Sequence, residues 1–379
     1  MHYYYDMEEC SLNTYEMRLK RTLDAVEMKP VDKIPFSYSG SAYVARRQGL
    51  VMKDFISDFP RAIEATVGFL TSHPGIDSIH SPIMCPHVLT PMWLSKVKVP
   101  GVELSDDELW QVDEREVLSV DDYDKILEVG YEEWVGDVLK NRLDDPIGKA
   151  ANFFRYMPDA FQKVAEAGVP VVNAANFGSP LEGFCGGRTL AKFFLDLYDM
   201  PELVKKAFDK AQEYLLGSFV GMLKAIKPIA AWVGGWRCAP DLMSPDTWRE
   251  YAWAYIKPAI YATLECGVLP ILHFDSNWDN AIETLKELPP RKCVLMLDGK
   301  TDIRRARAIL DDRMCILGDV PPTLLAFGTA DEVYNYTTKL IDDVGPKSGL
   351  IVSTGCDNPP NAVHENVDAM IQATIDYKV

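Results

Sequence analysis

The stretch CVLMLDGKTDIRRARAILDDRMCILG, residues 293–318, decides the fold because it contains a strand pattern, a helix pattern and a second strand pattern in succession. The apolar runs at 293–298 and 314–318 have the length of buried strands, and TDIRRARAIL between them has helical period. Thr301 and Asp302 open the helical segment with residue types that favour a helix start. Two strands joined through a helix indicate a parallel βαβ unit.

Six further apolar runs extend this pattern along the chain, and segments of helical period separate most of them. The six runs lie at 34–38, 76–80, 170–175, 229–234, 268–273 and 350–354. Eight alternating strand and helix units predict a (β/α)8 TIM barrel. In such a barrel the active site lies at the carboxyl ends of the strands, so polar residues that end these runs are candidates for function.

The stretch 85–148 breaks the rhythm with an acidic passage that includes SDDELWQVDEREVLSVDDYD. We interpret it as an insertion after the second strand, built of a small hairpin and two helices and packed over one end of the barrel. Residues 1–30 are interpreted as an N-terminal extension. With these additions, residues 1–379 are expected to form one barrel domain.

The balance of charges limits the classes of partner. The 379 residues include 39 Lys and Arg against 56 Asp and Glu, a formal net charge of -17. Nucleic acids and anionic membranes are bound through basic contacts to phosphate, so we expect neither, and any macromolecular partner should be a protein.

The chain has no run of about 18 apolar residues, and its start lacks the features of a signal peptide. We therefore expect a cytoplasmic protein. The eight cysteines are scattered without the spacing of a disulfide framework.

Three metal-ligand residue types end two of the apolar runs. In ILHFDSNWD, residues 271–279, His273 and Asp275 are two apart and therefore project to one face of a strand, while Phe274 points the other way. Cys356 follows the last run, in GLIVSTGCD. If the two strands are neighbours in a closed barrel, these residues form a three-ligand site with one open tetrahedral position, as in catalytic zinc sites. Separate structural roles for the three residues are the alternative.

Other polar residues near strand ends are weaker candidates. His80 ends the second run, where it is a general acid, a substrate contact or a structural histidine. Glu182 follows the third run and is an acid facing the barrel mouth or a solvated side chain. Asp298 and Asp319 suit helix caps as well as catalysis. The glycines of GFCGGRTL, 183–190, match no phosphate-loop spacing and predict a tight strand-to-helix turn.

Several blocks together resemble one family: RLKRTLDAVEMKPVDKIPFS, GSPLEGFCGGRTLAKFF, LMSPDTWREYAWAYIKPAI, VLPILHFD, GDVPPTLLAFGTADEV and STGCDNPPNAVHENVDAMI. Their order and spacing are similar to those of the uroporphyrinogen decarboxylase superfamily, whose members are (β/α)8 barrels. The resemblance extends from about residue 17 to the end of the chain. The fold alone does not define the chemistry.

Two branches of that superfamily differ in the segment after the first strand and in the histidine segment. The decarboxylase branch has an Arg-rich segment after its first strand, and SYSGSAYVARRQGL has Arg46 and Arg47 without that pattern. The cobalamin-linked methyltransferase branch ligates zinc through His-x-Cys and a later Cys. His273 and Cys356 match two of these positions, whereas Asp275 stands where coenzyme M methyltransferases have Cys. Carboxylate in place of thiolate should leave a harder zinc ion, suited to polarising a substrate oxygen.

The resemblance therefore implies a zinc enzyme that transfers a methyl group from a small-molecule donor, with an aryl methyl ether favoured, to cob(I)alamin on a separate corrinoid protein. A decarboxylase, a methylcobalamin:thiol methyltransferase and a binding protein on the same fold remain alternatives. A homodimer is one open state of assembly. Aromatic residues near strand ends are expected to line a flat apolar pocket or to pack in the core: Trp236, Phe274, Trp278 and Phe177.

Overall fold

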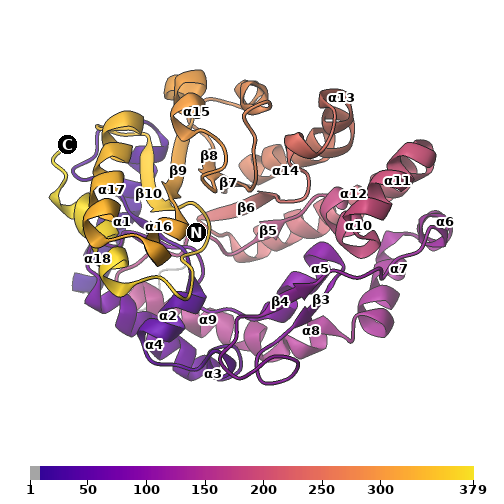
Figure 1. Ribbon diagram of the computed structural model, residues 1–379, viewed down its shortest axis with the longest axis horizontal. Helices are drawn as coiled ribbons and strands as arrows, with labels where there is room; N and C mark the ends of the chain where they lie inside the picture. The colour runs from indigo at the N-terminus through magenta and orange to yellow at the C-terminus, as the bar shows by residue number, and fades with distance from the viewer. Residues whose placement is uncertain (1–8) are drawn as a thin grey trace.

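The computed structural model describes residues 9–379, and its centre is a ring of eight parallel strands (Figure 1). Six consecutive strands form one sheet, two form another, and isolated bridges between Phe36 and Val352 and between Ile79 and Val171 join the two. This closure confirms the predicted (β/α)8 barrel. The strands are β1 Ser37–Tyr38, β2 Ser78–Ile79, β5 Asn176–Phe177, β6 Ala230–Gly235, β7 Leu269–Phe274, β8 Val294–Leu297, β9 Cys315–Val320 and β10 Leu350–Thr354.

The third barrel strand differs from its prediction at 170–175. Pro170 and Val172 form backbone hydrogen bonds of 2.9 Å with Ile79 on one side, and on the other side pairing with β6 begins where the Ala175 carbonyl accepts from the Trp232 N–H. The segment therefore pairs first with the β2 side and then with β6, because its two neighbouring strands lie beside different parts of its length. An apolar run in the sequence does not reveal that change.

Helices surround the barrel (Figure 1), with α17 packed against α18, while α1 contacts β2 and β10. Among the described helices, none is long and apolar enough to cross a membrane. The α-helices are α1 Glu9–Val26, α2 Ser41–Arg47, α3 Met52–Phe55, α4 Phe59–Ser72, α5 Thr90–Trp93, α6 Asp121–Val129, α7 Tyr131–Asp137, α8 Pro146–Lys149, α9 Ala151–Glu166, α10 Pro180–Arg188, α11 Leu190–Asp199, α12 Pro201–Ile226, α13 Pro245–Trp248, α14 Ala254–Glu265, α15 Ile303–Leu310, α16 Pro322–Phe327, α17 Ala330–Val344 and α18 His364–Asp376.

Short 3-10 and π segments complete the regular structure of residues 9–379. They are η1 Pro86–Leu89, η2 Val138–Arg142, η3 Pro240–Leu242, η4 Arg249–Trp253, η5 Ile282–Glu287 and η6 Asp311–Arg313.

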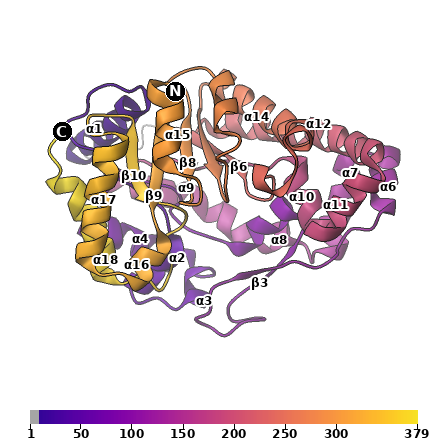
Figure 2. The ribbon, with the colours of Figure 1, turned by 45° about the horizontal axis from the view of Figure 1, so that its top comes forward.

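The stretch 85–148 contains an antiparallel hairpin, β3 Lys96–Lys98 with β4 Gln111–Asp113, and the helices α5, α6 and α7. Figure 2 shows the hairpin segment extending away from the barrel strands. Helix α5 packs on α10, where a Cβ at Gly186 would lie 1.9 Å from the Trp93 carbonyl oxygen. The glycines of 183–190 therefore lie within or beside α10 and permit this close packing. Their prediction as a tight turn is wrong because close helix packing also selects glycine.

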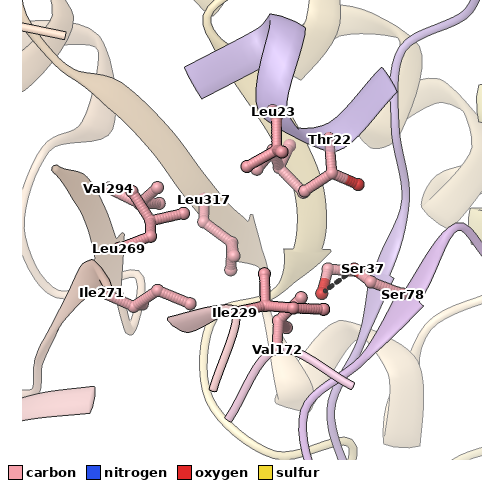
Figure 3. Close-up of a pocket in the computed structure, with 11 residues that line it drawn as sticks. Thr22, Leu23, Ser37, Ser78, Val172, Ile229, Leu269, Ile271, Val294 and Leu317 are labelled. Atoms are coloured by element: carbon pink, nitrogen blue, oxygen red, sulfur yellow. Dashed lines mark hydrogen bonds between the residues drawn. The ribbon is translucent and has the colours of Figure 1, made fainter. Parts of the chain in front are cut away.

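The amino end of the barrel holds a small cavity that is lined mostly by apolar side chains (Figure 3). Thr22 and Leu23 of α1 close its outer end, and Ser78 donates a hydrogen bond of 2.8 Å to the hydroxyl of the neighbouring Ser37 at its edge. Helix α1 is anchored there by buried Arg21, which pairs with Asp77. The residues that line this cavity identify the inward-facing positions of each strand, because inward positions recur every second residue along a strand.

Candidate metal centre

Strand β7 directs His273 into the barrel. Leu269 and Ile271 line the cavity at the amino end, so His273, at the next inward position, points into the opposite end of the barrel. The alternation continues past the strand to Asp275. His273 Nε2 lies 3.5 Å from Asp275 Oδ1, and His273 is 3% exposed. The two side chains therefore project together, as the spacing predicts.

Cys356 completes the group from the loop after β10. One ligand atom each from His273, Asp275 and Cys356 lies within 4.8 Å of the other two. A tetrahedral ion with bonds of about 2.1 Å has ligands about 3.4 Å apart, close to the His273 to Asp275 separation. Among residues 9–379, Asp275 Oδ1 is buried without a hydrogen-bond partner, and so is His273 Nδ1, the ring nitrogen other than the Nε2 that lies near Asp275. The donor set therefore fits a divalent metal with nitrogen, oxygen and sulfur ligands.

The surroundings of the three residues are anionic. Burial lowers the pKa of His273 to about 4, which keeps its imidazole neutral and able to bind a metal. Burial, followed by the carboxylates of Asp298, Glu182 and Asp357, raises the pKa of Asp275 to about 7. Burial and the Asp275 carboxylate likewise raise the pKa of Cys356 well above its usual range. A bound cation would favour the ionised forms of both acids.

Trp232 and His80 continue the barrel wall beyond His273. The Trp232 ring stacks on His273 with centroids 4.2 Å apart, and it also makes an edge-type contact with the His80 ring at 5.3 Å. Burial lowers the pKa of His80 to about 3, so this imidazole is neutral. The sequence prediction included His80 and missed Trp232. Trp232 could have been found from the alternation along β6, because it lies two residues before Gly234 and faces the same side of the strand. Placing it beside His273, however, requires the register between β6 and β7.

Glu182 lies at the site, but its carboxylate is bound by backbone groups. The side chain is fully buried in α10 and accepts hydrogen bonds of 2.9 to 3.2 Å from the backbone N–H groups of Trp236, Arg237 and Cys238. These donors form the turn that follows β6. Glu182 therefore holds that turn in place, and its proposed role as a proton-transfer acid has no support in this geometry.

Trp236 is the member of the predicted aromatic set that lies beside the ligands. Its ring is 6.2 Å from His273 and contacts Trp93 of the insertion at 5.7 Å. A Cβ on Gly234 would lie 2.0 Å from the Trp236 ring, so glycine is required for the ring to fold back over β6. The insertion therefore contributes Trp93 to the wall of the site, which the sequence did not indicate.

The other three predicted pocket residues lie in the core. Phe274 and Trp278 are both fully buried and stack with centroids 3.8 Å apart. Phe177 packs against Phe219 of α12 at 5.4 Å. The alternation that turns His273 inward turns Phe274 outward, so the structure places these rings behind the barrel wall and away from the metal ligands.

The remaining charged candidates have partners outside the ligand group. Asp298 accepts backbone hydrogen bonds from Ser276 and Lys300, and it is not a helix cap, because the N-cap of the next helix, α15, is Asp302. Asp319 accepts from the Tyr336 hydroxyl at 3.0 Å. Two arginines near the first strand also lie in outer ion pairs, Arg46 with Asp107 and Arg47 with Asp368.

Comparison with known proteins agrees with the barrel fold. Residues 137–377, more than half of the chain, match the family model described as uroporphyrinogen decarboxylase (URO-D). The chain belongs to the uroporphyrinogen decarboxylase family.

Two curated relatives illustrate the distance within this family. The chain is 27% identical over 175 residues to the uroporphyrinogen decarboxylase of Chlorobium phaeobacteroides, covering 45% of this chain and 47% of the relative. It is 24% identical over 215 residues to that of Pseudomonas fluorescens, covering 51% and 58%. The matches thus span about half the length of these relatives.

A solved structure is similar over nearly the whole chain. A methyltransferase from Methanosarcina mazei superposes with a TM-score of 0.69, covering 95% of this chain and 98% of the other at 17% identity. At this identity the likeness establishes a shared fold.

Proposed function

We propose that this protein is a zinc-dependent methyltransferase that transfers a methyl group from an aryl methyl ether to cob(I)alamin on a separate corrinoid protein. The observation that carries the proposal is the convergence of His273, Asp275 and Cys356 at the carboxyl ends of the barrel strands, where Asp275 Oδ1 is buried and has no hydrogen-bond partner among the described residues. Active sites of such barrels lie at this end. The methyltransferase from Methanosarcina mazei has the same fold, which is consistent with the proposal.

The three side chains would hold zinc and leave one position for a substrate oxygen. Zinc supplies Lewis acidity, which stabilises the negative charge that develops on that oxygen. His273 contributes a neutral nitrogen held in place by the Trp232 stack. Asp275 would contribute a carboxylate in place of a thiolate, and this harder ligand would suit the ion to an ether oxygen better than to a thiol substrate.

The overall reaction breaks the bond between the methyl carbon and the ether oxygen. The methyl group joins the cobalt of the incoming cob(I)alamin, whose electron pair forms the new bond, and the pair of the broken bond remains on the phenolate oxygen. His80, whose ring contacts Trp232, is a buried neutral imidazole and could donate an N–H hydrogen bond to an oxygen of the bound methyl donor. Glu182 is unsuited to protonate the phenolate oxygen because its own oxygens accept backbone hydrogen bonds.

Decarboxylation of a porphyrinogen is favoured by the names of the curated relatives but not by the charges of this site. Such a substrate carries many carboxylates and needs basic groups to hold them. The charged groups that act on Asp275 are the carboxylates of Asp298, Glu182 and Asp357. Arg46 and Arg47 form their ion pairs with residues outside the barrel.

The test is methyl transfer by the purified, zinc-loaded protein from 2-methoxyphenol to chemically reduced cobalamin, followed by the absorbance change on methylation. Asp275→Ala should lose zinc and methyl transfer together, because the site loses its carboxylate ligand. Asp241→Ala, at an exposed carboxylate of η3, is the control and should keep both. Full activity in metal-free Asp275→Ala would rule out the proposal.

A further inference from the structure

His80 is the buried polar side chain that the metal ligands leave unexplained. It is 2% exposed, and neither ring nitrogen has a hydrogen-bond partner within the described chain. Buried polar atoms in folded proteins are nearly always paired, and leaving them unpaired is costly. The indole Nε1 of Trp232 is buried and unpartnered in the same way. Two adjacent side chains therefore offer unused hydrogen-bonding groups.

These groups form one wall with the metal ligands. His80, which follows β2, contacts the Trp232 ring at 5.3 Å, and Trp232 stacks on His273 at 4.2 Å. His80 comes two residues after Ser78, which lines the cavity below, so the inward alternation places His80 in the barrel interior on the side of the metal ligands.

We propose that His80 and Trp232 form a subsite for an uncharged hydroxyl group on the methyl donor. This inference rests on the proposed function and adds a substrate class to it. A neutral imidazole offers one donor and one acceptor, and the indole adds a donor. A hydroxyl group donates once and accepts as well, so it can satisfy both residues, whereas a methoxy group only accepts. A carboxylate on the methyl donor is disfavoured at this subsite. Asp275 nearby already lies among other carboxylates, and neither His80 nor Trp232 offers a positive charge to pair with it.

The test compares binding of three ligands to the zinc-loaded protein by titration calorimetry: 2-methoxyphenol, 1,2-dimethoxybenzene and 2-methoxybenzoate. Wild-type protein should bind the phenol about tenfold more tightly than either of the others, because a buried polar pair is left unpaired without the hydroxyl. In His80→Phe the ratio of phenol to dimethoxybenzene affinity should fall to within about twofold. Trp232→Phe keeps an aromatic ring and should lower the ratio less.

Two controls separate the subsite from the metal centre. His80→Phe should keep its zinc, and His364→Phe, at an exposed position of α18, should keep the wild-type ratio. An unchanged ratio in folded His80→Phe, tightest binding of the benzoate, or no binding of any of the three ligands would overturn the subsite.

The binding ratio is independent of methyl transfer. A protein that shows the ratio but does not methylate cobalamin would keep the subsite and reject the proposed function. A protein that binds 2-methoxyphenol and 1,2-dimethoxybenzene equally and transfers the methyl group of both would keep the proposed function and reject the subsite.

Discussion

Removing the carboxylate of Glu182 should destabilise the turn that carries Trp236. Glu182→Ala leaves the backbone N–H groups of Trp236, Arg237 and Cys238 without their acceptor. Each buried donor left unpaired costs about 1–3 kcal/mol, and partial relaxation reduces the sum, so we expect the free energy of unfolding to fall by about 3–5 kcal/mol. Glu182→Gln keeps one oxygen acceptor and should lose about 1–2 kcal/mol, chiefly the charge assistance.

Urea unfolding followed by circular dichroism measures these differences. Glu283→Ala is the matched control, because the Glu283 side chain is 68% exposed in η5 and should change the unfolding free energy by less than about 0.5 kcal/mol. If Glu182→Ala unfolds at the same urea concentration as this control, the carboxylate does not hold the turn and the reasoning is wrong.

Burial raises the pKa of Asp319 to about 6, so its stabilising contribution is present at low pH and lost as pH rises through 6. The free energy of unfolding of Asp319→Asn should therefore rise relative to wild type by up to about 3 kcal/mol between about pH 4 and pH 7.5, as measured by urea unfolding. An unchanged difference across that range would contradict this sign. Gly234→Ala should lower stability by about 1–3 kcal/mol and alter the fluorescence of Trp236, because the new methyl group overlaps the ring. Gly217→Ala, in open space on α12, should instead raise stability by about 0.5–1 kcal/mol.

Strand periodicity was sufficient to predict the barrel and the neighbourhood of the three candidate ligands. His273 and Asp275 share a face because they are two residues apart, and Cys356 joins them because β10 ends at the same edge of the closed barrel. The same rule argues against a pocket role for Phe274, which occupies the alternate position. Strand geometry therefore constrains more of the site than the presence of aromatic residues does.

Features that depend on contacts between distant segments were not predictable from the sequence. The role of Glu182 depends on where the turn after β6 meets α10, and the approach of Trp93 depends on how the insertion folds onto that helix. Trp232 contacts His273 only through the register between β6 and β7. None of these contacts has a local pattern in the chain, so each requires the tertiary structure.

The most direct test of the proposed metal centre is the zinc content of the purified protein by elemental analysis, beside Cys356→Ser and Cys266→Ser. The half-buried Cys266 lies outside the ligand group and serves as the matched control. We predict about one zinc per chain in wild type and in Cys266→Ser, with loss in Cys356→Ser. No zinc in wild-type protein after incubation with the metal, or full zinc retained by Cys356→Ser, would contradict the three-ligand centre.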